Sequence, residues 1–246
     1  MVGSVPVNKG GVRIYAGLEV ELAEGWKTYW RQPGDAGGIP PYFDWSKSKN
    51  LKSTAVKFPP PTRFRDSLGE AIGYKRRVVY PVLLEPEDWR RPLGLALDVH
   101  YGVCREICIP AQARFAIEVH FKQLQIMPPS LAEALQRLPK GLDEATSHAP
   151  RLAYATSTLT GASPSLVFDV TYPQGLDGAD LFIDAGSDVY LPMAKPIEHL
   201  SSVSVRYRVD LGNGVDRSVL AGRRLVLTLV GANESVEMFY DVPTLR

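Results

Sequence analysis

Apolar and polar side chains alternate in Val12-Arg-Ile-Tyr-Ala-Gly-Leu-Glu-Val-Glu-Leu22. Successive side chains of a β-strand point to opposite faces of a sheet, so this period of two predicts a strand with one buried face. The same alternation recurs in the first half of the chain at 78–84, 93–99 and 113–121. Four strands of this kind predict an antiparallel β-sandwich.

The second half of the chain repeats this pattern. Apolar residues alternate with polar ones at 166–172, 203–211, 225–229 and 236–240. Between the second and third of these stretches, Asn213-Gly214 is a typical two-residue hairpin turn. The second half therefore predicts another β-sandwich. It contains no cysteine and no cluster of titratable residues that would indicate chemistry.

The length of 246 residues and a 45% share of hydrophobic residues suit two modest domains. One helix is expected between them, because Ser130 and Glu133 match a capping box and leucines recur on one face up to Pro139. We therefore expect a first sandwich domain over residues 1–125, a linker with a short helix over 126–150 and a second sandwich over 151–246.

A long segment rich in Gly, Pro and aromatic residues, from Gly25 to Tyr74, separates the first two predicted strands. Irregular segments of this length are uncommon unless they are functional or packed. Its large aromatic side chains are expected to pack down and order the segment rather than to form a binding surface. They are Trp26, Tyr29, Trp30, Tyr42, Phe43 and Trp45.

Charge and hydropathy exclude several classes of partner. The 28 Lys and Arg residues nearly balance the 27 Asp and Glu residues, so neither nucleic acid nor an acidic membrane surface is expected. No run approaches 18 apolar residues, and the first residues lack the apolar core of a secretion signal, so the chain is expected to be soluble and unanchored. An ectodomain without its leader and membrane segments would look the same.

The two cysteines of the chain, Cys104 and Cys108, lie four positions apart. Disulfide geometry requires Cα atoms about 4.4–6.8 Å apart, whereas four extended residues span about 13 Å, so the segment must turn if the sulfurs bond. A short turn or a helical loop would suffice. Closing so small a ring removes little chain entropy, which makes a purely structural staple the weaker explanation. A redox pair, an inert local disulfide and a soft-metal site all remain open.

The metal alternative has few supporting ligands. Zinc favours four ligands, and thiolates also favour Cu(I). If 93–101 and 113–121 pair as antiparallel strands, His120 lies about 20 Å from Cys104 at ~3.3 Å per residue. His100 alone remains near the pair, and by alternation it is expected to point to solvent or toward the loop.

Four motifs follow one another along the first half of the chain. They are Gly25-Trp-Lys-Thr-Tyr-Trp-Arg-Gln-Pro-Gly-Asp-Ala36, Pro40-Pro-Tyr-Phe-Asp-Trp45, Ile72-Gly-Tyr74 and Tyr101-Gly-Val-Cys104 to Cys108-Ile-Pro110. Together and in this order, they resemble the N-terminal periplasmic domain of the DsbD/ScsB family of protein-disulfide reductases, and its ScsB-like (suppressor of copper sensitivity) members most closely. The resemblance covers about residues 12–121.

The resemblance implies two immunoglobulin-like antiparallel β-sandwich domains, the first carrying Cys104 and Cys108 as its redox pair. In this family the pair takes electrons from the transmembrane domain of its own parent protein and passes them to periplasmic thioredoxin-fold proteins, with no cofactor. A cap loop shields the disulfide. By position it corresponds to Asp66, Ser67, Leu68, Gly69 and Glu70, although the sequence departs from the DsbD cap there and the cysteine spacing is narrower.

Thiol–disulfide exchange requires one accessible sulfur and a second sulfur that resolves the mixed disulfide. Cys104 and Cys108 satisfy this requirement, with the order of attack undetermined, and Tyr101 and His100 are their neighbours. The candidate cap or tuning residues are Asp66, Leu68, Glu70 and Tyr101. The expected function is thiol:disulfide interchange by the periplasmic ectodomain of an inner-membrane protein. A copper-binding module or a passive scaffold of a copper-tolerance protein is the alternative.

Overall fold

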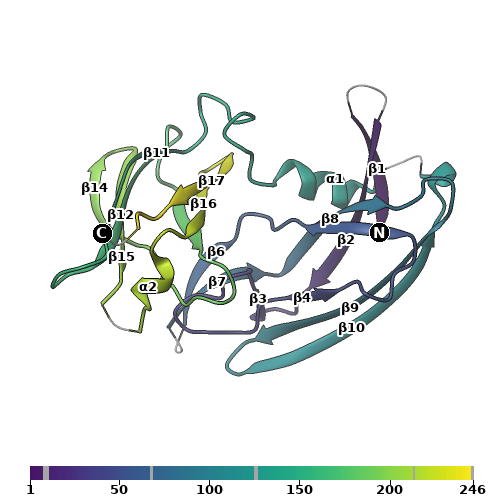
Figure 1. Cartoon of the computed structure of the whole chain (residues 1–246), viewed down its shortest axis with the longest axis horizontal. Coiled ribbons are helices and arrows are strands. Elements are labelled where there is room, and N and C mark those ends of the chain that lie inside the picture. The colour runs from purple at the N-terminus through teal and green to yellow at the C-terminus, as the bar shows by residue number, and fades with distance from the viewer. Residues whose placement is uncertain (8–10, 67–68, 125–126, 213, 245–246) are drawn as a thin grey trace. The chain divides into compact units, whose positions relative to one another are not determined.

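The computed structural model describes residues 1–7, 11–66, 69–124, 127–212 and 214–244. The chain divides into two compact units, Met1–Leu138 and Pro139–Arg246. Figure 1 shows that both are built mainly of strands, and each contains two antiparallel sheets. The prediction of an all-β, immunoglobulin-like sandwich fold is confirmed. Within the described ranges, no helix has the length and apolar character needed to cross a membrane.

The first unit contains a four-stranded and a six-stranded sheet. The smaller sheet has the order β1 (Val2–Val7), β2 (Gly11–Glu21), β8 (Arg77–Pro86) and β5 (Leu51–Val56). The larger has the order β10 (Cys108–Val119), β9 (Leu93–Cys104), β3 (Lys27–Tyr29), β7 (Gly69–Lys75) and β6 (Thr62–Asp66). Its sixth strand, β4 (Tyr42–Asp44), also pairs with β9. Strands β10 and β6 therefore form the two edges of the larger sheet.

Alternate residues of the predicted strands fill the space between these sheets. Along β9, residues 93, 95, 97 and 99 are buried, whereas the residues between them are half-buried or exposed. Leu93 and Leu95 pack in one core cluster with buried residues of the smaller sheet, which are Ile14 and Ala16 of β2 and Val82 and Leu84 of β8. Burial of this apolar face is the main stabilising contribution to the first unit.

The segment from Gly25 to Tyr74 is not irregular, in contrast to the prediction, because it contains β3, β4, β5, β6 and most of β7. These strands are only three to seven residues long, too short for a clear period of two. The expectation that its aromatic residues pack inward is confirmed for Tyr29 and Trp30, which are buried, and is wrong for Tyr42, which is exposed.

The predicted helix, α1 (Pro129–Gln136), follows a short 3-10 turn, η1 (Phe121–Gln123). It belongs to the first unit, where Leu131 and Ala134 pack against Val79 of β8. The predicted capping box is wrong. The N-cap residue is Pro128, which has no side-chain acceptor, and Pro129 occupies the first turn, a position that suits its fixed φ. The division between the two units falls within 126–150, the segment predicted as a linker.

The second unit also contains two sheets around one core. One has the order β11 (Arg151–Thr158), β12 (Ser165–Thr171), β15 (Ser204–Asp210) and β14 (Lys195–Ser201). The other has the order β13 (Asp180–Asp184), β16 (Arg224–Val230) and β17 (Ser235–Asp241). Buried residues of β12 and β15, such as Phe168 and Val209, meet Leu225, Leu227 and Leu229 of β16.

The hairpin predicted at Asn213-Gly214 is wrong, although Asn213 itself lies outside the described residues. The flanking strands β15 and β16 belong to different sheets, and a four-residue helix, α2 (Arg217–Leu220), lies in the connection. Asp216 caps this helix by accepting a hydrogen bond from the Ser218 N–H. The connection therefore crosses from one sheet to the other instead of reversing within a sheet.

Candidate redox site at the tip of the β9–β10 hairpin

The two cysteines end one strand and begin the next. Cys104 is the last residue of β9 and Cys108 is the first residue of β10, and they are direct cross-strand partners. Their Cα atoms are 4.1 Å apart and their sulfurs form a disulfide. The three residues between them make a tight hairpin loop in which the Arg105 N–H donates to the Ile107 carbonyl at 3.2 Å. The turn that the spacing requires is thus a β-hairpin tip rather than a helical loop.

The two sulfurs belong to residues with opposite environments. Cys104 has an exposed fraction of 0%, because it packs with Tyr29, Phe64 and Ala71 from β3, β6 and β7. Cys108 is exposed, since it opens the edge strand of the sheet. The residue at one end of the disulfide is therefore exposed at the surface, whereas the residue at the other end is buried inside the domain.

Tyr29 contacts both sulfurs. Its hydroxyl donates a hydrogen bond to Cys104 Sγ at 2.9 Å and lies 3.0 Å from Cys108 Sγ. Burial raises the pKa of Tyr29 above its ordinary value of 10.0, which keeps the hydroxyl protonated and able to donate. Sequence reasoning assigned Tyr29 only a packing role, because a contact across 75 positions leaves no local signal.

Two glycines allow Tyr29 to reach the disulfide. Gly38 has a φ of +151°, and a Cβ there would lie 2.4 Å from the Tyr29 ring. Gly73 pairs with Tyr29 across β3 and β7, and a Cβ on it would lie 2.0 Å from the Thr28 carbonyl oxygen. Both positions bring backbone so close to β3 that a side chain would displace it. At these two positions of the segment, the close approach requires glycine.

A cationic pair lies beside the buried sulfur. Lys27 is the cross-strand partner of Cys104, so the two side chains share one face of the sheet. Lys27 is buried, and the Nζ atoms of Lys27 and Lys75 each lie 5.1 Å from the centre of the Phe64 ring. Burial, and then the charge of Lys75, lower the pKa of Lys27 below its ordinary 10.5. Positive charge here would stabilise a thiolate at Cys104.

Two of the candidate cap residues lie on β6 and β7. Asp66 ends β6 and pairs with Gly69, whereas Leu68, with Ser67, lies outside the described residues. The Glu70 carboxylate of β7 is engaged by Arg65 at 2.9 Å and Arg63 at 3.5 Å. The Glu70 side chain is thus held by arginines of the neighbouring strand β6.

The two predicted neighbours of the cysteines on β9, Tyr101 and His100, lie on opposite faces of the strand. Tyr101 is three residues from Cys104 and therefore lies on the opposite face of the strand. His100 shares the face of Cys104, but it is exposed and its Nε2 lies 3.2 Å from the Asp98 carboxylate and from Gln112. The structure thus brings neither ring to the sulfurs. Exposed Ile107 and Ile109 instead flank Cys108.

Comparison with known proteins identifies the first unit. Residues 8–119 match the family model described as thiol:disulfide interchange protein DsbD, N-terminal. These residues form a DsbD N-terminal domain. The match includes both cysteines and ends at the last residue of β10, so the first unit is a thiol:disulfide interchange domain with a cysteine pair.

A solved structure shares the fold of both units. The crystal structure of the N-terminal periplasmic domain of ScsB from Proteus mirabilis has a TM-score of 0.68 and 19% sequence identity. The match covers 99% of this chain and 92% of that one. A comparison with curated protein sequences gives no significant match. The resemblance seen in the sequence motifs is thus confirmed for the DsbD-type domain, and the likeness of fold extends through the second unit.

Proposed function

We propose that this chain is the periplasmic ectodomain of an inner-membrane protein. Its Cys104/Cys108 couple relays electrons from a membrane-embedded reductase domain of the same parent protein to periplasmic thioredoxin-fold proteins. The DsbD N-terminal match over residues 8–119 and the fold shared with a periplasmic ScsB domain support this assignment. The observation that carries it is the unequal exposure of the two bonded cysteines.

Reduction of the Cys104–Cys108 disulfide begins at the sulfur of the exposed residue, Cys108. A thiolate of the electron donor attacks Cys108 Sγ, the Cys104–Cys108 bond breaks, and Cys104 leaves as a thiolate. The second thiol of the donor then attacks its own sulfur in the mixed disulfide and releases Cys108. The donor becomes a disulfide, this chain becomes a dithiol, and the two protons lost by the donor thiols are regained by the two cysteines.

In the second half of the cycle, the dithiol form of this chain reduces a target disulfide, so this chain becomes the electron donor. The Cys108 thiolate attacks the disulfide of a thioredoxin-fold target and forms a mixed disulfide with it. Cys104, held at the adjoining strand end, then attacks Cys108 Sγ and releases the target as a dithiol. Two electrons have passed to the target, and the disulfide of this chain is restored. Cys108 is thus the sulfur shared with partners, and Cys104 is the resolving sulfur.

The surroundings of Cys104 favour its departure as a thiolate. The Tyr29 hydroxyl already donates to its sulfur at 2.9 Å, and a hydrogen bond to a charged sulfur is stronger than one to a neutral sulfur. Lys27 adds positive charge from the neighbouring strand. Tyr29 and Lys27 therefore stabilise the reduced state of the cysteine pair more than its oxidised state.

Phe64 of β6 and Ala71 of β7 pack directly against Cys104, which supports a cap role for the segment between them. The exposed Ile107 and Ile109 would offer apolar contacts to a partner. Asp66, Leu68 and Glu70 would then tune access rather than take part in exchange.

Single-cysteine variants test the proposal. A thioredoxin-fold protein with one active-site cysteine is converted to its thionitrobenzoate mixed disulfide, and Cys104→Ser or Cys108→Ser is added so that its remaining thiol is the attacking group. Release of coloured thionitrobenzoate and formation of an inter-protein disulfide are followed. We expect Cys104→Ser, which retains Cys108, to react readily, and Cys108→Ser to react at least about tenfold more slowly because its sulfur is buried.

Circular dichroism and urea unfolding of both variants would show that each is folded. Equal rates for the two folded variants would overturn the assignment of Cys108 as the sulfur that meets partners. If neither thiol exchanged with the thioredoxin-fold protein in the native state, the relay function itself would be rejected. Among the described residues, no group of three or more His, Cys, Asp or Glu side chains is placed to hold a metal ion.

A further inference from the structure

The edge strand β10 is long and regularly paired. It spans twelve residues, is paired throughout with β9 without a register shift, and has no second partner among the described strands. Figure 1 shows β9 and β10 as a long curved ribbon with β10 on the outside. The edge strands β5, β11 and β14 contain register shifts, which weaken an edge as a template for pairing, and the edge strands without such shifts, β1, β6, β13 and β17, are only five to seven residues long.

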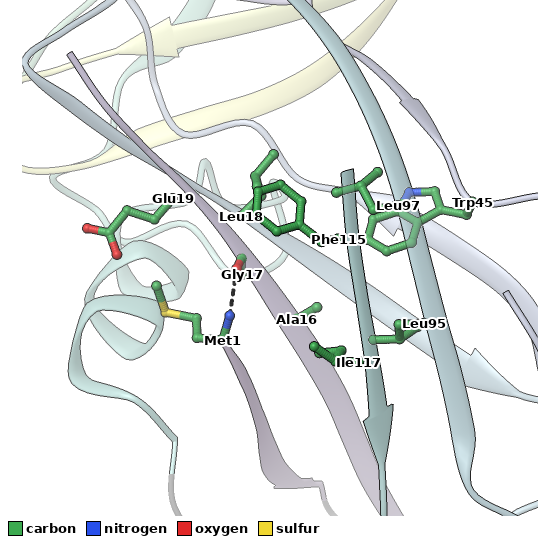
Figure 2. Close-up of a pocket in the computed structure, with 10 residues that line it drawn as sticks. All are labelled: Met1, Ala16, Gly17, Leu18, Glu19, Trp45, Leu95, Leu97, Phe115 and Ile117. Carbon is green, nitrogen blue, oxygen red and sulfur yellow. Dashed lines mark hydrogen bonds between the residues drawn. The ribbon is translucent and has the colours of Figure 1, made fainter. Parts of the chain in front are cut away.

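The inward face of β10 is only partly covered. Phe115 and Ile117 pair with Leu97 and Leu95, which are buried, yet they remain 51% and 47% exposed. Figure 2 shows them at the side of a cavity of about 300 Å³ that is also lined by Trp45 and by Ala16 of β2. The smaller sheet therefore does not cover this end of the larger one, and an apolar strip follows the free edge.

The sequence of β10 is complementary to itself. In an antiparallel pair centred on Ala116, Arg114 of one copy lies opposite Glu118 of the other, and Phe115 lies opposite Ile117. Each contact occurs twice because of the two-fold symmetry. The charged pair falls on the outer face of the sheet and the apolar pair on the inner face, as the alternation along β10 requires.

We propose that two copies of this chain associate through the free edges of their β10 strands, antiparallel, with the two-fold axis at Ala116. The Arg114 and Glu118 side chains are mostly exposed, and their present contacts, to Asp98 at 2.8 Å and His120 at 2.7 Å, lie at the surface. Like charges on an edge strand would oppose such pairing, whereas these opposite charges select this register.

The arrangement leaves both redox sites free. Cys108 lies eight residues from Ala116, which is about 26 Å along a strand at ~3.3 Å per residue. The two hairpin tips would therefore lie at opposite ends of the paired strands, on the order of 50 Å apart. Association depends on neither cysteine, so it can be tested separately from the redox function.

Sedimentation equilibrium of the oxidised 246-residue chain, at concentrations up to about 1 mM, tests the association. We expect the mass to rise from 27.1 kDa toward twice that value. Glu118→Arg should weaken dimerisation by about tenfold or more, because it places two Arg–Arg pairs across the axis. The charge swap Arg114→Glu/Glu118→Arg should restore it.

A cross-link tests the register. Ala116→Cys should be joined to its counterpart by a short bis-maleimide, which does not react with the Cys104–Cys108 disulfide. Gln112→Cys, on the same face of β10, is the matched control and should not cross-link, because its counterpart would lie about 26 Å away. A wild-type mass of 27.1 kDa at every concentration, or equal dimerisation of wild type and Glu118→Arg, would overturn the proposal. Efficient cross-linking at Gln112→Cys would also reject this register.

Discussion

Replacing Tyr29 by Phe removes one hydroxyl from the disulfide and leaves the packed ring in place. That hydroxyl donates to Cys104 Sγ at 2.9 Å and lies 3.0 Å from Cys108 Sγ. In the oxidised state it meets neutral sulfur, a weak acceptor. In the reduced state it can donate to a thiolate, and a hydrogen bond to a charged group contributes about 1.5–3 kcal/mol. The substitution should therefore destabilise the dithiol form selectively.

The expected change follows from the two-electron couple. Because about 1.4 kcal/mol corresponds to 30 mV, Tyr29→Phe should lower the reduction potential by about 30–60 mV and make the protein a stronger reductant. The potential can be measured by equilibration in glutathione buffers, followed by alkylation of free thiols and mass spectrometry. The expected effect is greatest at a pH where the reduced site is ionised.

Tyr74→Phe is the matched control. Its hydroxyl is also on a buried ring of the first unit, but it donates to the Pro59 carbonyl at 2.8 Å instead of to sulfur. The control should keep the wild-type potential even if it loses some stability. An unchanged potential in Tyr29→Phe, or an equal shift in both variants, would refute the argument that Tyr29 supports the reduced state.

Two further changes probe the surroundings of the site. Lys27→Met should lower the reduction potential by tens of millivolts, since it removes positive charge beside Cys104. Because the pKa of Lys27 is lowered in the folded protein, the unfolded chain binds more protons than the folded one between that pKa and 10.5. The free energy of unfolding of wild type, measured in urea and compared with that of Lys27→Met, should therefore rise with pH through this window. Gly73→Ala should cost about 3 kcal/mol or more in the same assay, because its Cβ would meet the Thr28 carbonyl oxygen.

Each of these outcomes has a clear opposite. A higher potential in Lys27→Met would mean that the lysine stabilises the oxidised form instead. A relative stability that is flat or falls toward pH 10.5 would contradict the depressed pKa of Lys27. Gly38→Ala offers a comparison for Gly73→Ala, because its Cβ would meet the Tyr29 ring rather than backbone. Equal and small losses in the free energy of unfolding of both variants would show that β3 can shift to accommodate the added Cβ.

Much of the strand content was predictable from local sequence. The period of two in 78–84, 93–99 and 113–121 marks parts of β8, β9 and β10, because these strands are long and bury one face. The strands β3 to β7 were not predictable in this way. They are short, and Gly73 of β7 serves a close backbone approach that a pattern of hydrophobicity does not record.

Some residues of the candidate site could likewise be found from the sequence, whereas others could be found only from the structure. Two cysteines four positions apart already mark the candidate site, and the motifs around them indicate the DsbD/ScsB family, because both signals lie in contiguous sequence. Tyr29, Lys27 and Phe64 join the site from strands 40 to 77 positions away, since β3 and β6 lie in the same sheet as β9. Their contribution could be found only after the sheet order was known.

By itself, the sequence determined the all-β class, the sulfur pair and the family of the first unit, since alternation and motif spacing are properties of neighbouring residues. Only the tertiary structure decided that Cys104 is sealed while Cys108 is exposed, and that β10 keeps a free edge. The physical reason is that burial and edge position depend on which strands pair and pack across the sandwich. Those contacts join residues that are distant along the chain.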